Sequence, residues 1–185
     1  MASKKFQWFP LTVAVVALLM LTAQVQAQCI IGTAGNDVLG GTPGNDCIFG
    51  RAGNDDIYGE AGNDDLYGEG GADELYGMTG TNYSDGGDGD DYMSLGDGSD
   101  TGDGWTGNDQ AYGGAGGDYI LGWDGDDFLS GHGDSDTIYG ENNNDDILGG
   151  WGNEYIDGGA GFDAIDGGIH TDTCVNGEIV ANCEA

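Results

Sequence analysis

The chain has 185 residues, of which 34 are acidic, 3 are basic and 40 are glycine, and its formal net charge is −31. This charge excludes nucleic acid as a partner, because two polyanions repel each other. A chain so acidic and so rich in glycine is also expected to repel itself into disorder unless cations intervene.

Residues 1–27 have the features of a Sec-type signal peptide. Lys4 and Lys5 precede an apolar stretch at residues 11–21, and a small-residue cleavage site ends at Ala27. The apolar stretch is too short for a transmembrane helix, and no other segment is apolar enough to span a bilayer. We therefore expect a secreted or periplasmic protein, with no transmembrane segment in its mature form.

A nine-residue unit repeats sixteen times from Gly32 to Val175 without insertion or deletion. Its positions are numbered one to nine here, and GRAGNDDIY (50–58) is a typical unit. Position one is glycine in fifteen units and position four in thirteen, which predicts left-handed backbone angles or close approach of neighbouring chain there. Position eight is Leu or Ile in eleven units. Positions seven to nine therefore predict a three-residue strand with one inward side chain.

Position six offers a side-chain oxygen in every unit. The residues are Asp37, Asp46, Asp55, Asp64, Asp73, Asn82, Asp91, Asp100, Asp109, Asp118, Asp127, Asp136, Asp145, Glu154, Asp163 and Asp172. Carboxylates and backbone carbonyls together suit Ca²⁺, which accepts six to eight oxygens in flexible geometry, whereas Mg²⁺ demands a tighter octahedron. Soft metals need clusters of thiolate or imidazole, and His132 and His170 are isolated in the sequence.

This pattern resembles the hemolysin-type calcium-binding repeat of RTX proteins, over 144 of 185 residues. The resemblance implies an all-β fold, a right-handed parallel β-roll (solenoid) of about eight 18-residue coils, with calcium between stacked turns. Seven gaps on each of two edges give up to about 14 Ca²⁺ ions. One edge runs through Asp37 and the other through Asp46. The Asp46 edge includes Asn82 and Glu154, beside which we expect weaker sites.

Four cysteines allow three pairings, and two disulfides are typical of an exported chain of this size. In the implied roll, Cys29 and Cys47 lie on adjacent coils at about 4.8 Å, which is within disulfide range. Cys174 and Cys183 flank an Asn-Gly pair, which is a type I′ turn signal. We therefore expect a signal peptide at 1–27, a roll with an N-terminal disulfide cap at 28–175, and a C-terminal capping hairpin at 176–185.

The sequence contains no HExxH and no complete GxSxG motif, so we expect no enzymatic activity. The expected function is that of a secreted protein that folds on binding multiple Ca²⁺ ions and has a structural or binding role. One alternative is a detached accessory module of an RTX-type secreted enzyme.

A second alternative is a calcium-stabilised recognition module for a glycan, a protein or an ice surface. In the implied roll, position seven alternates Tyr and Thr from Tyr83 to Thr173 on one outer face, and Trp105 and Trp123 stack at position two. Tyr and Thr are also simply good strand formers.

Residues 77–112 break the repeat most often. The departures are Asn82, Ser84, Leu95, Gly102 and Ala111. We expect this middle of the roll to be its most mobile part and the last to become ordered.

Overall fold

The computed structural model describes residues 29–184, so the expected signal peptide lies outside the described residues. The described chain is built from eighteen strands in two nine-stranded sheets. Over the same residues, no helix is long and apolar enough to cross a membrane.

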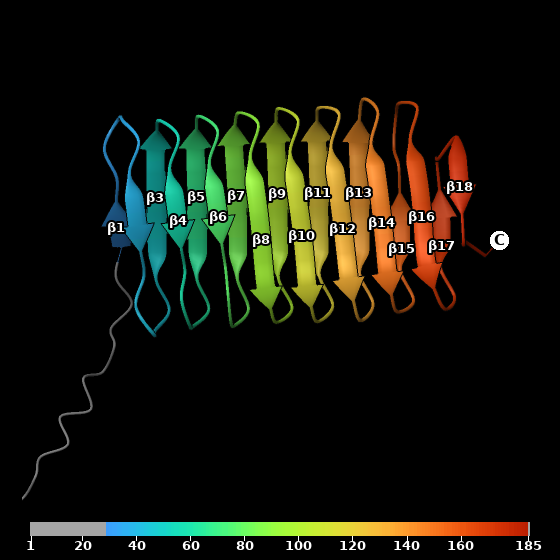
Figure 1. Ribbon diagram of the computed structural model, residues 1–185, viewed down its shortest axis with the longest axis horizontal. Coiled ribbons are helices and arrows are strands. Elements are labelled where there is room, and N and C mark those ends of the chain that lie inside the picture. The colour runs from blue at the N-terminus through green and yellow to red at the C-terminus, as the bar shows by residue number, and fades with distance from the viewer. Residues whose placement is uncertain (1–28, 185) are drawn as a thin grey trace, which may run out of the picture.

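The odd-numbered strands form one sheet and the even-numbered strands the other, each in chain order (Figure 1). The odd-strand sheet contains β1 (Cys29–Ile31), β3 (Cys47–Ala52), β5 (Asp65–Gly70), β7 (Tyr83–Asp88), β9 (Thr101–Thr106), β11 (Tyr119–Asp124), β13 (Thr137–Asn142), β15 (Tyr155–Asp157) and β17 (Thr173–Val175). The even-strand sheet contains β2 (Val38–Gly40), β4 (Asp56–Tyr58), β6 (Glu74–Tyr76), β8 (Tyr92–Asp97), β10 (Gln110–Ala115), β12 (Phe128–Gly133), β14 (Asp146–Trp151), β16 (Ala164–Ile169) and β18 (Ile179–Ala181).

Neighbouring strands are parallel and offset by one coil of the chain. Cys47 pairs with Asp65, and Tyr119 pairs with Thr137, eighteen residues further on in each case. Because the chain alternates between the sheets, two nine-residue units complete one coil. The predicted parallel β-roll of about eight coils is confirmed. The turns between the sheets form two edges, which we call the Asp37 edge and the Asp46 edge.

Most strands are six residues long, so the expectation of three-residue strands was wrong. Pairing does not stop at position nine but continues into the next unit, where Arg51 pairs with Glu69. Position two bends the backbone without ending the ladder, because its residues adopt positive φ angles, 73° at Trp105 and 70° at His132. Glycine occupies this position in only six of the sixteen units, which is why the longer strand was missed.

Glycine recurs at positions one and four of the unit for different reasons. At position one, a methyl group added to Gly50 would lie 2.5 Å from Asp55 Oδ2 and 2.9 Å from the Gly68 carbonyl oxygen, so no side chain fits. At position four the backbone is left-handed, with φ of 113° at Gly53. The first position therefore needs space, and the fourth needs conformational freedom as well as space, because a methyl group added to Gly53 would lie 2.6 Å from the Gly35 carbonyl carbon.

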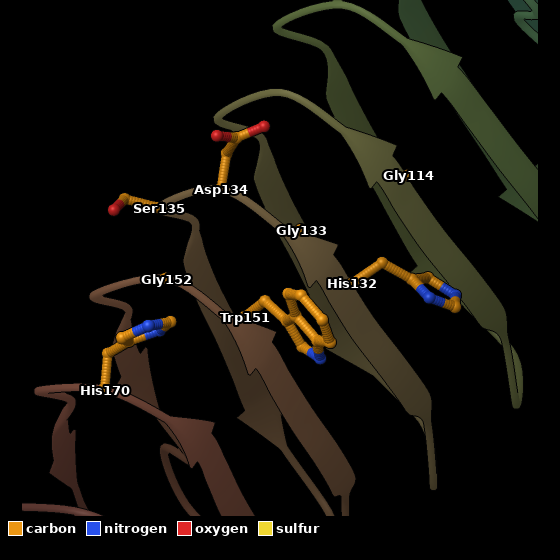
Figure 2. A pocket seen from close by; sticks show the side chains of 8 residues that line it. All are labelled: Gly114, His132, Gly133, Asp134, Ser135, Trp151, Gly152 and His170. Atoms are coloured by element: carbon orange, nitrogen blue, oxygen red, sulfur yellow. The ribbon is translucent and has the colours of Figure 1, made fainter.

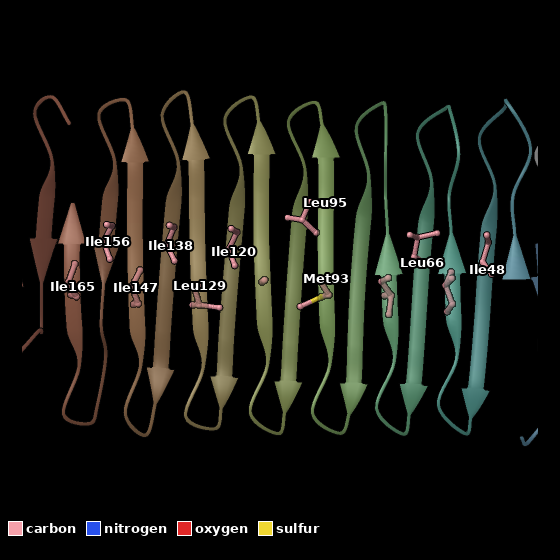
Figure 3. Packing of buried hydrophobic residues seen from close by; sticks show 13 residues of the cluster. Ile48, Leu66, Met93, Leu95, Ile120, Leu129, Ile138, Ile147, Ile156 and Ile165 are labelled. Atoms are coloured by element: carbon pink, nitrogen blue, oxygen red, sulfur yellow. The ribbon is translucent and has the colours of Figure 1, made fainter. Parts of the chain in front are cut away.

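Position eight points into the space between the sheets and forms the core (Figure 3). The buried hydrophobic residues are Ile48, Ile57, Leu66, Leu75, Met93, Leu95, Ala111, Ile120, Leu129, Ile138, Ile147, Ile156 and Ile165. No single unit buries its apolar residue alone, so the roll depends on stacking between neighbouring coils.

The core is repaired in the middle of the roll. Ser84 and Gly102 occupy position eight on adjacent strands and leave too little apolar volume. Leu95, which stands in the place of a position-one glycine on the opposite sheet, is fully buried, and its methyl groups lie next to Gly102. One departure from the repeat thus compensates for two others.

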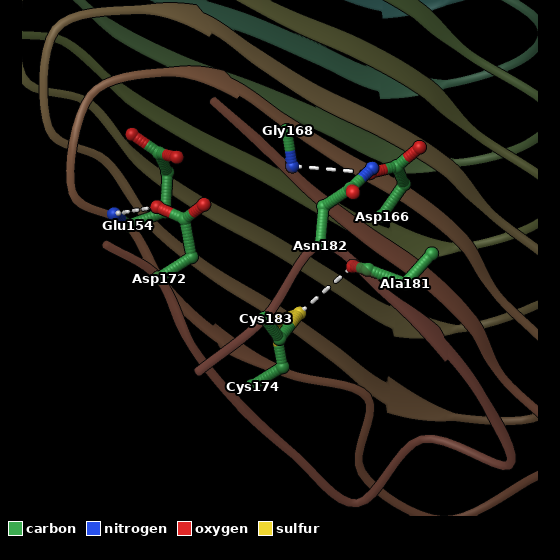
Figure 4. Close-up of a disulfide and its surroundings, with 8 residues drawn as sticks. All are labelled: Glu154, Asp166, Gly168, Asp172, Cys174, Ala181, Asn182 and Cys183. Carbon is green, nitrogen blue, oxygen red and sulfur yellow. Dashed lines mark hydrogen bonds between the residues drawn. A yellow bond between two sulfur atoms is a disulfide. The ribbon is translucent and has the colours of Figure 1, made fainter. Parts of the chain in front are cut away.

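Covalent bonds close both ends of the roll, as predicted. Cys29 is bonded to Cys47 with a Cα–Cα distance of 4.6 Å, and Cys174 to Cys183 with 5.7 Å. Figure 4 shows the second disulfide beside the last turn of the Asp46 edge.

The segment after Val175 differs from the expected hairpin at 176–185. β18 pairs in parallel with β16, and Ala164 lies opposite Ile179, only fifteen residues away. The Asn-Gly turn therefore leads into one more half-coil with a turn shortened by three residues. Extending the even-strand sheet covers Ile165, which an antiparallel hairpin on β17 would leave open.

Candidate metal sites in the turns

The position-six side chains form a buried ladder along each edge of the roll. The N–H of Asp55 donates to Asp73 Oδ1 at 2.7 Å, and the N–H of Asp109 donates to Asp127 Oδ1 at 2.8 Å, one coil further on in both cases. Both accepting side chains are at most 2% exposed. Each turn thus holds the next one through one carboxylate oxygen.

The second oxygen of these carboxylates is buried without a hydrogen-bond partner. It is so in Asp55, Asp64, Asp73, Asp91, Asp100, Asp109, Asp118, Asp127, Asp136, Asp145, Asp163 and Asp172, and in Glu154 both oxygens lack a partner. At Gly104, one added methyl group would lie 2.5 Å from Asp109 Oδ2 and 2.7 Å from the Gly122 carbonyl oxygen. An orphaned carboxylate oxygen and a carbonyl oxygen of the next coil therefore converge in most of these turns.

Burial makes ionisation of these carboxyl groups costly. Loss of hydration raises the pKa of Asp109 to about 8, although the hydrogen bond from the Asp91 N–H opposes the rise. The same cause raises the pKa of Asp73 to about 6 and that of Asp136 to about 7. A carboxylate that is buried and unpaired needs either a proton or a cation.

These turns fit a hard cation that accepts carbonyl ligands. Over the described residues, no three His, Cys, Asp or Glu side chains form a group that could hold a metal by themselves. The donors available in each turn are one carboxylate and backbone carbonyls, all of them oxygen, and glycine keeps space beside them. Ca²⁺ accepts this mixture, whereas Zn²⁺ and other softer metals require nitrogen or sulfur ligands.

The first turn of each edge satisfies its own carboxylate. The Thr33 hydroxyl donates to Asp37 Oδ2 at 2.9 Å, and the Thr42 hydroxyl donates to Asp46 Oδ2 at 2.8 Å. Asp37 is also half-buried rather than buried. The two carboxylates at the start of the repeat, predicted as metal ligands, thus differ from those that follow.

Asn82 makes a hydrogen bond where the carboxylates of other turns have an oxygen without a partner. Its Oδ1 accepts the Asp64 N–H at 3.0 Å, as an aspartate would, while its Nδ2 donates to the Leu95 carbonyl at 3.4 Å. That carbonyl corresponds to the one that converges on the orphaned oxygen in other turns. The expected weaker site at Asn82 stays a prediction, and this geometry gives it a physical reason.

Glu154 interrupts the ladder on the same edge. Its Oε2 lies beside Gly149, in the place that Asp Oδ2 takes elsewhere, but neither carboxylate oxygen has a hydrogen-bond partner. Loss of hydration, together with the neighbouring Asp172, raises the pKa of Glu154 to about 8. The expected weaker site here is likewise untested.

Two features of the turns were missed in the sequence. Glu178 continues the ladder, since its Oε2 accepts the Asp163 N–H at 2.7 Å, but its fifteen-residue spacing hides it. Position five forms a second, exposed ladder in which the Asn54 N–H donates to Asn36 Oδ1 at 3.1 Å. The recurrence of Asn and Asp at position five was the available signal.

A two-sheet parallel roll whose turns enclose rows of carboxylates defines a calcium-binding β-solenoid. The sequence matches the RTX calcium-binding nonapeptide repeat (4 copies) over residues 30–57, 40–75, 50–84, 76–111, 103–138, 124–153 and 148–178. The chain belongs to this family, and it is a calcium-binding structural module. No curated protein matches it.

Proposed function

We propose that this chain is an exported protein whose roll folds as it binds Ca²⁺ and then serves as a rigid structural or binding module. The observation that carries the proposal is the row of buried carboxylate oxygens without partners, twelve from aspartate, in addition to those of Glu154. The twelve turns with such an aspartate and the turn of Glu154 give thirteen places for a cation, close to the predicted upper count of about 14.

Bound Ca²⁺ would supply positive charge and accept the oxygens that nothing else satisfies. The chain's own residues contribute the rest: Oδ1 holds the neighbouring turn, and glycine at position one leaves room beside Oδ2. Because these oxygens converge only in the stacked coils, ion binding and folding form one equilibrium.

Export is supported by two features. The segment at 1–27 has the composition of a signal peptide, and all four cysteines pair in disulfides, which persist in oxidising compartments. The proposal assigns no catalytic activity, because the sequence has neither HExxH nor a complete GxSxG motif.

The test is a calcium titration of residues 28–185, followed by circular dichroism and by Trp fluorescence. Trp105 and Trp123 stack at 5.6 Å on the odd-strand sheet and should report ordering of the middle coils. Chelator and Mg²⁺ serve as controls. We expect a cooperative gain of β structure with Ca²⁺ alone, and a chain that is fully folded in chelator and indifferent to Ca²⁺ would refute the proposal.

A second candidate function is recognition by the odd-strand face. The Tyr/Thr row is in register, and Tyr119 and Tyr155 are 41% and 38% exposed. The ring of Tyr139, at position nine, lies 5.6 Å and 5.8 Å from these two rings, so the three tyrosines form a continuous aromatic surface. Changing Tyr119 and Tyr155 to Ser should abolish glycan or protein binding at this face while calcium uptake stays normal. Unchanged binding by this variant would refute the surface.

A further inference from the structure

The two histidines of the chain lie 38 residues apart in the sequence but line one hollow on the Asp46 edge. Figure 2 shows Trp151 between His132 and His170, with Asp134 and Ser135 on the adjoining turn. Residues 36 apart occupy the same place two coils further along, and His170 stands two residues beyond the place that corresponds to His132, so both border the same hollow. The roll thus assembles a group of side chains that no single unit contains.

Glycine neighbours make the hollow. His132 pairs with Gly114 on one side and Gly150 on the other, and Trp151 pairs with Gly133. Without side chains on these neighbours, a space of about 650 Å³ opens around the indole, which is 68% exposed. Pockets for small molecules commonly have this size.

The residues around the hollow depart from the repeat at a conformational cost. Position four is glycine in most units, yet Asp134 and His170 occupy it here with φ of 72° and 105°. Other side chains of the roll also adopt positive φ angles, such as Arg51 and Glu141 at position two. What distinguishes the hollow is that polar side chains replace glycine beside an exposed indole.

The chemistry of the lining selects the class of ligand. Over the described residues, no three His, Cys, Asp or Glu side chains are grouped so that they could hold a metal. The net charge of −31 and the Asp134 carboxylate disfavour anions. What remains is a flat apolar platform with hydrogen-bonding groups at its rim.

We infer that this hollow binds a neutral saccharide. The apolar face of a pyranose ring would pack on the Trp151 indole, and its hydroxyl groups would meet groups that can donate and accept. The Asp134 carboxylate accepts, and Ser135 Oγ already accepts the Asn153 N–H at 3.0 Å and keeps its own proton to donate. The imidazole of His170 offers both functions at one end, and at the other end that of His132 does so from a ring that packs against Tyr112 at 5.8 Å.

This site differs from the Tyr/Thr face, which lies on the odd-strand sheet. Saccharide binding in the hollow requires a folded roll, but it does not depend on whether calcium drives the folding. Failure of saccharide binding therefore leaves the proposed calcium-dependent folding intact, whereas failure of folding is detected separately by circular dichroism.

The experiment screens the calcium-loaded protein on an array of neutral and acidic glycans and follows each hit by titration calorimetry. The variants are Trp151→Ala and, as a control, Phe162→Ala, which removes an exposed aromatic ring from the Asp37 edge. We expect neutral glycans to bind, with affinity reduced about tenfold or more in Trp151→Ala and unchanged in Phe162→Ala. His132→Ala should weaken binding less, because it removes only one rim contact.

Three outcomes would overturn the inference. The first is that no glycan on the array binds the wild type differently from Trp151→Ala. The second is binding that survives this substitution unchanged. The third is saturable binding of tetramethylammonium chloride at Trp151 without any neutral glycan, which would assign the hollow to organic cations instead.

Discussion

Asp145 and Asp146 are neighbours that differ only in what surrounds their carboxylates. Asp145 is 2% exposed, and its Oδ2 has no partner, whereas Asp146 is exposed on β14. Replacing either by Asn removes one negative charge. Only Asp145→Asn removes an orphaned oxygen from a turn, so the pair separates the effect of the candidate site from that of net charge.

The structure supplies the expected size of the effect. In chelator at pH 7.5, Asp145→Asn should stabilise the roll by about 1–3 kcal/mol, which is the usual cost of a buried group without a partner. The new Nδ2 would face the Gly158 carbonyl, as Asn82 Nδ2 faces that of Leu95. With Ca²⁺ at a hundredfold its dissociation constant, the variant loses about 2.7 kcal/mol of linkage from one missing ion.

The assay combines urea unfolding, at two Ca²⁺ concentrations that both keep the chain folded, with bound calcium measured by elemental analysis. We expect Asp145→Asn to bind one ion fewer per chain and to show a smaller difference in stability between the two conditions. Asp146→Asn should match the wild type in bound calcium. Equal ion counts in the two variants, or an equal response of both to the Ca²⁺ concentration, would refute the assignment of the orphaned oxygens as calcium ligands.

Three further predictions concern pH, the turn of Asn82 and the core around Leu95. The buried carboxyl groups have pKa values of about 6 to 8 in the fold, against 3.8 for unperturbed aspartate. Their protonation therefore stabilises the calcium-free roll fully below pH 3.8, and this stability is lost as pH rises through the pKa values of the fold. Circular dichroism in chelator should show more β structure at pH 5 than at pH 8, while calcium-loaded protein should release its ions when it is acidified from pH 8 to pH 5. Asn82→Asp should add one bound ion per chain and lower stability in chelator, and an unchanged ion count would contradict the role given to the Asn82 amide. Leu95→Gly restores the repeat but removes a buried side chain from the core, so it should lower the free energy of unfolding in urea with Ca²⁺ by about 2–5 kcal/mol. Leu95→Gly combined with Gly102→Leu should recover part of this loss. An unchanged free energy of unfolding in the single variant would refute the compensation.

The regular phase of the repeat made most of the fold predictable. A constant period of nine places residues eighteen apart on adjacent strands, and this rule alone located the Cys29–Cys47 pair and the two rows of position-six residues. The longer strands were not predictable in this way, because position two adopts left-handed angles with residues as large as Trp105. Propensity gives no warning of a strained residue that tertiary pairing holds in place.

What escaped the sequence depends on contacts that the period does not describe. Glu178 joins the ladder only because three residues are missing from the last turn. Leu95 fills the space above Gly102 across the two sheets, a relation between positions one and eight that a column of aligned units does not reveal. The middle of the roll was expected to be mobile because its units depart from the repeat, but the buried Leu95 shows that some departures restore packing.

The two edges of the roll differ in what their turns contain. On the Asp37 edge every position-six residue is aspartate, and from Asp55 to Asp163 each leaves an oxygen for a cation. The Asp46 edge contains the neutral Asn82 turn, the interrupted ladder at Glu154 and the hollow around Trp151. Strand pairing in both sheets also holds neighbouring coils in register, so the register does not depend on the Asp46 ladder alone. The Asp46 edge can therefore carry the side chains of the hollow beside its position-six carboxylates.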